Sequence, residues 1–292
     1  MSEVLRPLRE QDALQVAALF RIAFGADRPI DEQEIVSWFR NPELKTEWLQ
    51  VLETSGGVVG YGDIWIDNDE LALEVAAPGH WATFLEWAED AARSARVSRT
   101  RAFFPAGHEL ADVVRRRGYR LWRSAYTMEI DLGDDEPRSP PVPEGLELRE
   151  YRGGETDALR SALNEAFRQQ PFFHEATESH FREFYLQARG FDPSLWLLAW
   201  DGSELAGFVL SFPERAGERG IGWVESLGVR PAWRGRGLGE VLLRAAFREL
   251  HARGLRRVGL GVDADNETGA LRLYERVGMR PIRQGDNWVL DL

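Results

Sequence analysis

A glycine-rich turn at residues 230–239 contains the residues best suited to bind a phosphate group. It reads Arg-Pro-Ala-Trp-Arg-Gly-Arg-Gly-Leu-Gly and follows a predicted strand, Trp223–Val229. Its three spaced glycines let backbone approach a ligand closely, and apolar residues from Leu238 to Leu250 recur at helical spacing. Free N–H groups at the start of such a helix, with its positive dipole end, attract phosphate, and Arg234 and Arg236 add charge.

This turn differs from two common nucleotide-binding motifs. A Walker loop would end in Gly-Lys-Ser/Thr, which this turn lacks. A dinucleotide fingerprint counted from Gly235 would need a glycine at 240, where the chain has Glu240. The remaining interpretations are a phosphate site of another kind and a simple helix-capping turn.

The strand end Val-Arg-Pro followed by Arg-Gly-Arg-Gly-Leu-Gly resembles the pyrophosphate loop of the GCN5-related N-acetyltransferases, the GNAT superfamily. The resemblance covers nearly all of residues 146–292. Residues 265–279 are similar to the family's second motif, a loop asparagine followed by a helix that ends in a tyrosine and a glycine. The resemblance implies acetyl-CoA (coenzyme A) as the acyl donor. It assigns donor binding to Leu227, Gly228, Val229, Arg234, Gly235, Arg236, Gly237, Leu238, Gly239 and Asn266.

The reaction that the resemblance implies joins an amine to the acyl group of a thioester. A free alkyl amine has a pKa near ~10 and must lose a proton before it attacks. Glu225 is the candidate base, directly or through a water, and Tyr274 is the candidate acid that protonates the leaving thiolate. N–H groups of Leu227–Val229 would stabilise the oxyanion. The alternatives are a strand glutamate in a salt bridge and a core tyrosine.

Two segments are expected to form the acceptor wall, because in this family it usually follows the first helix and precedes the last strand. Here they are residues 168–184 and 283–288. An aromatic wall with a few carboxylates suits a cationic, partly apolar amine. We therefore expect acceptor contacts from Phe173, Glu175, Asp286 and Trp288. The alternative is that the phenylalanines at 172 and 173 only cover a helix end.

The composition narrows the class of protein. The 292 residues carry a net charge of −12, which argues against a general nucleic-acid binder. The absence of cysteine excludes disulfides and thiolate metal sites. No metal is expected, because His174–Glu178 lacks the second histidine of a zinc protease motif. Neither a signal peptide nor a membrane span of ~20 apolar residues is visible, so a soluble cytoplasmic protein, monomer or homodimer, is expected.

The elements that would position these residues occur twice along the chain. Each half predicts a strand, a helix, a hairpin, a third strand that ends in proline, and then helix, strand, helix and strand. Duplication explains this order best, and two unrelated α+β domains are the alternative. We therefore predict an α/β (α+β) fold of two tandem GNAT-like domains, each with a mixed, mostly antiparallel central sheet flanked by helices.

A proline-rich acidic segment, Asp131–Gly145, separates the halves. Its prolines favour an extended conformation, so we predict a linker at 132–145 between domains 1–131 and 146–292. A long surface loop within one domain is the alternative.

The first copy lacks the residues that carry the chemistry. Aligning Pro78 with Pro231 places His80 and Trp81 where the arginines and glycines of the turn stand in the second copy. Aligning the later glycines places Val114 where Tyr274 stands, and a valine cannot donate a proton. We expect a degenerate domain that stabilises the pair. A domain that binds another acyl-CoA without turnover is the alternative.

The prediction is an acetyl-CoA-dependent N-acetyltransferase that acts on a primary amine of a small molecule, with its active site in the C-terminal domain. The tandem layout resembles that of the mycothiol synthases, in which the second copy is the active one. We take the architecture from this resemblance and not the substrate. The alternatives are a protein N-acetyltransferase, a mycothiol synthase-like transferase and a non-catalytic acyl-CoA sensor.

Overall fold

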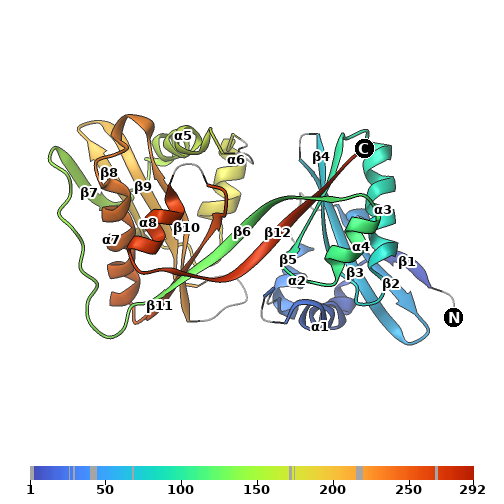
Figure 1. Ribbon diagram of the computed structural model, residues 1–292. Helices are drawn as coiled ribbons and strands as arrows, with labels where there is room; N and C mark the ends of the chain where they lie inside the picture. The colour runs from blue at the N-terminus through green and yellow to red at the C-terminus, as the bar shows by residue number, and fades with distance from the viewer. Residues whose placement is uncertain are drawn as a thin grey trace. The chain divides into compact units, whose positions relative to one another are not determined.

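The computed structural model describes residues 3–25, 27–28, 30–39, 45–67, 69–170, 173, 175–214, 220–266 and 269–292. They form two compact units (Figure 1). The first comprises Met1–Tyr126 with Arg283–Leu292, and the second Thr127–Ile282. Among the described residues, no helix has the length and apolar character that crossing a membrane requires.

The first unit is a mixed sheet with neighbouring strands in the order β1-β2-β3-β4-β5-β12. All these neighbours are antiparallel except β4 and β5. Its elements are β1 (Val4–Pro7), α1 (Ala13–Phe24), α2 (Glu32–Trp38), β2 (Leu49–Thr54), β3 (Gly57–Asp67), β4 (Glu70–Ala76), α3 (Trp81–Ala95), β5 (Arg99–Pro105), α4 (Leu110–Arg116), β6 (Arg120–Asp131) and the end of β12 (Arg280–Asp291).

The second unit repeats this plan, with strands in the order β6-β11-β10-β9-β8-β7. Only β10 and β11 are parallel among its described register pairs. Its elements are β7 (Leu146–Glu150), α5 (Thr156–Phe167), α6 (Glu178–Phe181), a π-helix (Arg182–Leu186), β8 (Trp196–Asp201), β9 (Glu204–Phe212), β10 (Ile221–Val229), α7 (Leu238–Ala252), β11 (Arg257–Asp263) and α8 (Ala270–Arg276). The predicted mixed, mostly antiparallel sheets flanked by helices are confirmed.

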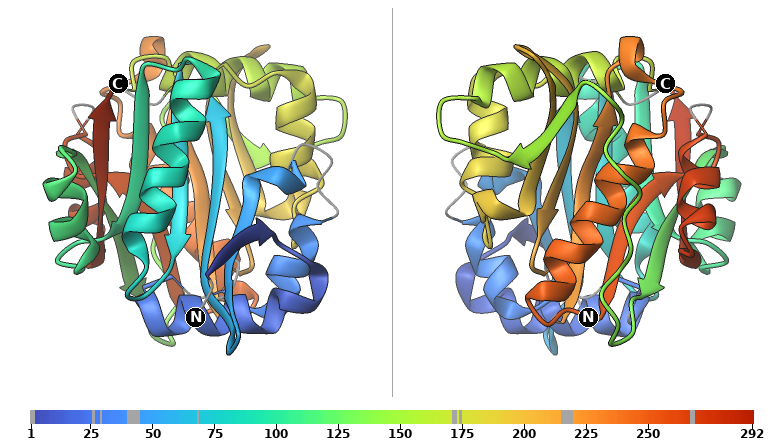
Figure 2. Two further views of the ribbon diagram at one scale, coloured as in Figure 1. Left: turned by 90° about the vertical axis from the view of Figure 1, so that its right-hand side faces the viewer. Right: turned by 90° about the vertical axis from the view of Figure 1, so that its left-hand side faces the viewer.

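In both units, side chains that alternate along a strand contact helices on the two opposite faces of the sheet. In β3, a Cβ on Gly60 would lie 2.7 Å from Phe84 of α3, whereas the next residue, Tyr61, contacts Phe20 of α1. Neighbouring residues of a strand point to opposite faces, so α3 and α1 cover opposite faces of the sheet. Figure 2 shows α3 in front of the first sheet in its left view and α7 in front of the second in its right view.

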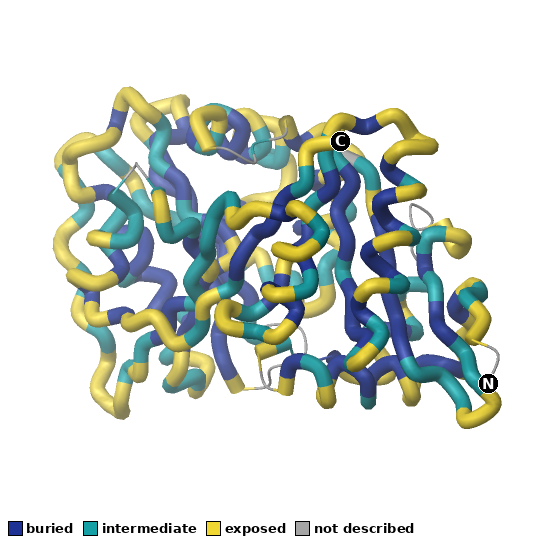
Figure 3. The backbone as a smooth tube through the Cα atoms, turned by 45° about the vertical axis from the view of Figure 1, so that its right-hand side comes forward, coloured by how far each residue is buried: buried dark blue, intermediate teal, exposed yellow. Residues whose placement is uncertain are grey.

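The second unit uses a glycine and an aromatic residue in the same way. A Cβ on Gly207 would lie 3.1 Å from Leu242 of α7, and its neighbour Phe208 meets Phe167 of α5 edge-on. Buried segments, dark blue in Figure 3, accordingly follow the strands, and eight of the nine residues of β9 are buried. Helix α7 is thus held against the sheet at a fixed place, which positions its N-terminus.

The last strands of the two halves are exchanged between the units. Gly285–Asp291 of β12 pair with β5 in the first unit. Thr127–Asp131 of β6 belong to the second unit, where Glu129 forms an ion pair with Arg257 of β11. The compact units therefore differ from the predicted domains, 1–131 and 146–292, by this exchange. Residues 132–145 contain neither helix nor strand.

Candidate active site

The middle of β10 carries a β-bulge. Its register with β9 shifts between Val224, opposite Ser211, and Ser226, opposite Leu210, so that Glu225 is the extra residue. Among the described residues, the parallel pairing of β10 with β11 runs from Ile221 to Val224 and ends there. Bulges bend a strand and interrupt its ladder. The two parallel strands therefore part at the bulge.

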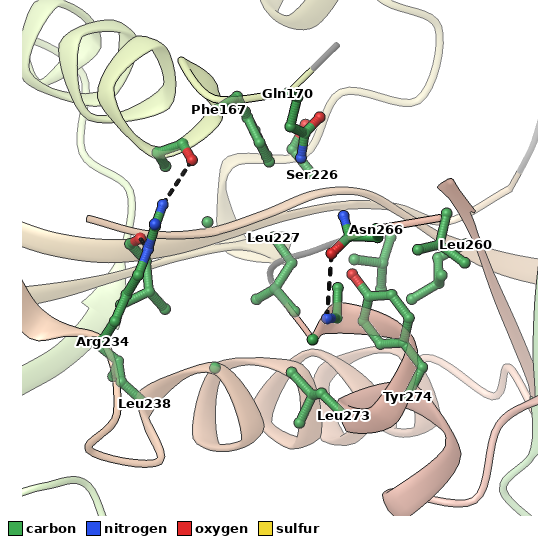
Figure 4. Close-up of a pocket in the computed structure, with 18 of the residues that line it drawn as sticks. Phe167, Gln170, Ser226, Leu227, Arg234, Leu238, Leu260, Asn266, Leu273 and Tyr274 are labelled. Carbon is green, nitrogen blue, oxygen red and sulfur yellow. Dashed lines mark hydrogen bonds between the residues drawn. The ribbon is translucent and has the colours of Figure 1, made fainter. Parts of the chain in front are cut away.

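A cavity of about 680 Å³ lies where the strands part (Figure 4). Residues 224–229 of β10 line one side of it, and residues 260–263 of β11 line the other. In Figure 4, Ser226 and Gln170 lie on the upper side of the view, and Leu273 and Tyr274 lie on the lower side. The helix starts of α7 and α8 also border it, so the cavity brings together the residues that the resemblance assigns to donor binding, apart from Arg236.

The glycine-rich turn leaves backbone donors free at the start of α7. Gly235 and Gly237 have φ angles of +77° and +79°, which other residues rarely adopt. Gly237 is the N-cap, and no side chain caps the helix there. Its carbonyl accepts the N–H groups of Glu240 and Val241, while those of Leu238 and Gly239 have no acceptor among the described residues. An anion at this end would satisfy them.

Arg234 and Arg236 of the turn differ in their contacts. The Arg234 Nε donates to the Val229 carbonyl at 3.0 Å, and its Nη2 donates to the Ala166 carbonyl at 2.8 Å. Figure 4 draws these contacts, which tie the turn to the ends of β10 and α5. Arg236 is exposed and is not among the described residues that line the cavity. Arg234 therefore holds the turn in place.

Tyr274 points from α8 into the cavity (Figure 4). Its side chain is 7% exposed, and its hydroxyl has no hydrogen-bond partner among the described residues. Burial raises the pKa of Tyr274 to about 12, so the phenol keeps its proton at ordinary pH. At the start of this helix, the Asn266 Oδ1 accepts the Ala270 N–H at 3.4 Å. Asn266 thus helps to fix α8, and Glu267 and Thr268 of the same motif lie outside the described residues.

Glu225 lies at the bulge with an exposed side chain that lines the cavity. The Trp223 Nε1 donates to its Oε2 at 2.9 Å. This bond holds the carboxylate in one orientation from the same face of the strand. The position and orientation suit a base that acts on a group bound in the cavity.

The predicted acceptor residues are not brought together. Phe173 lines the cavity, but Glu175 is exposed and is not among the described lining residues. Asp286 and Trp288 lie on the exchanged strand, in the first unit. Asp286 accepts a hydrogen bond from Ser124 at 2.7 Å, and Trp288 is 3% exposed and stacks on Phe104. Sequence order placed these two near the active site, whereas strand exchange places them in the core of the other unit.

Sequence reasoning missed Tyr185 and Ser226, which line the cavity and hydrogen-bond to each other at 2.9 Å. Tyr185 lies one residue beyond the segment expected to form the acceptor wall. It belongs to a π-helix, a feature frequent at functional sites but not readable from residue spacing. The polar Ser226 within a buried strand was the available signal.

The first unit lacks the bulge, although its parallel pairing of β4 with β5 likewise ends at Leu73. Strand β4 pairs with β3 from Tyr61–Ala76 to Asp67–Glu70 without a register shift. The helix that follows begins at Trp81, which is 5% exposed and donates from its Nε1 to Glu109 at 2.7 Å. Val114, the fifth residue of α4 as Tyr274 is of α8, is fully buried in the core. An indole and an aliphatic side chain thus occupy the two positions that border the cavity in the second unit.

The chain resembles known acetyltransferases in sequence and in structure. Residues 157–279 match the profile of the acetyltransferase (GNAT) family. The chain is 35% identical over 290 residues to a mycothiol acetyltransferase of Salinispora tropica, with 93% of this chain and 91% of the relative covered. It is 34% identical over 287 residues to the mycothiol acetyltransferase of Salinispora arenicola, with 94% and 91% covered.

Two solved structures share the architecture. A GCN5-related N-acetyltransferase from Sphaerobacter thermophilus superposes with a TM-score of 0.82 at 26% identity, covering 99% of this chain and 95% of that one. A tandem GNAT protein from the clavulanic acid biosynthesis pathway superposes with a TM-score of 0.70 at 17% identity, covering 99% and 98%. The second of these supports the fold alone.

Proposed function

Because the chain belongs to the GNAT family and is an N-acetyltransferase, we propose that the cavity of the second unit binds acetyl-CoA and acetylates a primary amine of a small molecule. One observation carries this proposal. The bulge with Glu225, the free N–H groups of the glycine-rich turn and the hydroxyl of Tyr274 all border the same cavity. We accordingly propose that the second unit is the catalytic domain and that residues 132–145 are the linker.

The residues present fit acetyl-CoA. The N–H groups of Leu238 and Gly239 suit a pyrophosphate. The turn around Gly235 and Gly237 leaves open space, since no described residue beyond the chain neighbours has an atom within 4 Å of a Cβ built at either glycine. The backbone of β10 beyond the bulge can pair with an extended amide-containing arm. A cavity of about 680 Å³ lies within the usual size range of small-molecule sites, ~300–1,000 Å³. Acetyl-CoA supplies the thioester whose acyl group is transferred.

Two side chains are placed to move the protons of this reaction. The amine nitrogen gains a bond to the acyl carbon while the carbon–sulfur bond breaks, so one proton must leave nitrogen and one must reach sulfur. Glu225 is positioned to take the first. Tyr274, neutral at ordinary pH and without another partner among the described residues, is positioned to give the second.

A mycothiol-type acceptor is the second candidate. It is favoured by relatives named mycothiol acetyltransferase, which match more than nine-tenths of this chain at 34–35% identity. The test is a panel of small amines, an amine of the mycothiol type and a peptide, each scored by acetyl-CoA-dependent release of free thiol. Turnover of a peptide alone would instead favour a protein acceptor, and no turnover with any amine would contradict the proposal.

Only one donor site is expected per chain. The second unit has the free N–H groups and the bulged strand, whereas β4 of the first unit is unbulged and Trp81 is buried at its helix start. Titration calorimetry of the full chain with acetyl-CoA should give a stoichiometry near one. Two equivalent sites per chain would contradict the interpretation of the first copy as degenerate.

A further inference from the structure

Two buried hydroxyl groups face the cavity beside Glu225. Tyr185 and Ser226 are each 8% exposed, and their hydroxyl oxygens lie 2.9 Å apart. Both line the cavity. Glu225 lines the same cavity, and its charge acts on Tyr185, so the hydroxyl pair and the carboxylate border one cavity.

The tyrosine ring is held firmly in place. It lies 4.8 Å from the ring of Phe181, 4.9 Å from that of Phe184 and 6.1 Å from that of Trp196, measured between centroids. Such packing fixes both side-chain torsions. Burial, together with the charge of Glu225, raises the pKa of Tyr185 to about 12, so the phenol remains neutral.

The hydrogen-bonding capacity of the pair exceeds what the protein uses. Two hydroxyls carry two protons and four lone pairs, and their mutual bond uses one of each. One further proton and the remaining lone pairs are available to a group in the cavity. A group bound there can therefore donate to the pair while it also donates to Glu225.

We propose that the Tyr185–Ser226 pair positions the acceptor nitrogen: it accepts one N–H of the bound amine while Glu225 accepts another. This inference rests on the proposed function. With two N–H groups held, the nitrogen stays in one place beside the candidate base while its proton moves to Glu225. Tyr185 and Ser226 are thus positioning residues beside the candidate base.

The surroundings of the pair define the class of amine. The described lining residues contributed by α5 and the segment after it are all uncharged. They are Leu163, Ala166, Phe167, Gln170, Phe173 and Tyr185. An amine with an apolar or aromatic body fits this wall. A carboxylate next to its nitrogen would be repelled by Glu225, and none of these lining residues supplies a cation to balance it. The acceptor class is therefore a primary amine with an apolar or aromatic body and no adjacent carboxylate.

Two probes of equal charge test whether the site recognises the N–H groups of the bound amine. Phenethylammonium has N–H donors, and phenethyltrimethylammonium has none. Their affinities for the full chain saturated with coenzyme A can be measured by calorimetry. Tyr185→Phe and Ser226→Ala should each raise the Kd of phenethylammonium by ~10-fold, about the worth of one hydrogen bond. The Kd of the trimethyl probe and the KM for acetyl-CoA should not change.

A matched control is available in the same unit. The Tyr151 hydroxyl bonds to the Thr156 hydroxyl at 2.7 Å, and the Tyr151 ring also packs on Trp196, but the residue is not among the described residues that line the cavity. Tyr151→Phe removes the same kind of bond and should leave both Kd values unchanged. The double variant of Tyr185 and Ser226 should bind phenethylammonium no more weakly than either single variant, because each single substitution already breaks the hydrogen bond between the two hydroxyls.

The proposal is overturned if the variants weaken both probes equally, or if Tyr151→Phe has the same effect as Tyr185→Phe. It is also overturned in its substrate class if the wild type binds phenylalanine as well as phenethylammonium, or binds neither. Acetyl-CoA binding and thiol release with other amines report separately on the proposed function.

Discussion

Gly237→Glu is expected to abolish acetyl-CoA binding, with a loss of affinity of at least ~10³-fold. Gly237 is the N-cap of α7 and precedes the free N–H groups of Leu238 and Gly239. A glutamate here brings a negative charge to the place where the helix dipole and free donors would hold a phosphate. The fold should survive, because in the described part of the chain only the sequence neighbours lie within 4 Å of a Cβ at this position. Calorimetry with acetyl-CoA measures the effect.

Gly254→Glu is the matched control. Gly254 has a φ of +84°, compared with +79° for Gly237, and an equally open Cβ position, but it follows the other end of the same helix. Both variants carry the same cost, ~1–2 kcal/mol, of a left-handed backbone for a residue with a side chain. Thermal unfolding should therefore shift by a similar amount in both. Normal acetyl-CoA affinity in Gly237→Glu would place the donor outside this cavity.

Glu225→Gln and Tyr274→Phe should each lower kcat by ~10²-fold with little change in acetyl-CoA affinity, since each removes one proton transfer. In the wild type, ionisation of Tyr274 should not reduce the rate below pH ~11, because its pKa is raised to about 12 and a group with a raised pKa stays protonated below that value. Rate profiles at saturating acetyl-CoA measure both effects.

The control for the tyrosine is again Tyr151→Phe, which should keep full turnover. Normal kcat in both Glu225→Gln and Tyr274→Phe would mean that water or the substrate handles the protons. A fall in kcat for Tyr274→Phe with a parallel loss of donor affinity would instead assign Tyr274 to binding.

The features that local sequence could predict are those that a short motif determines. The turn from Arg234 to Gly239 required positive φ angles and a helix start, and both are present. The element order of each half also followed from alternation, helical spacing and turn residues. Tyr274 was proposed from its resemblance to the tyrosine of the family's second motif, and the structure places it at the cavity.

The features that sequence could not predict depend on contacts distant in the chain. Tyr185 forms its hydrogen bond with Ser226, which lies 41 residues later in the chain, and the π-helix that contains Tyr185 positions its ring. The bulge at Glu225 appears only once the register with β9 is known. Asp286 and Trp288 were misplaced because strand exchange depends on which sheet accepts β12, and alternation within a strand is the same in either sheet.

Because the final strands are exchanged, each unit depends on residues from both halves of the chain. Glu129 of the first half is bound to Arg257 in the second unit, and Trp288 of the second half fills the core of the first unit. A gene cut at the linker would encode a second half without its partner strand beside β11, and the bared strand would be open to aggregation. A deletion of either half would therefore remove a strand from the unit that the other half mostly forms. Both halves of the chain are thus needed to complete either unit.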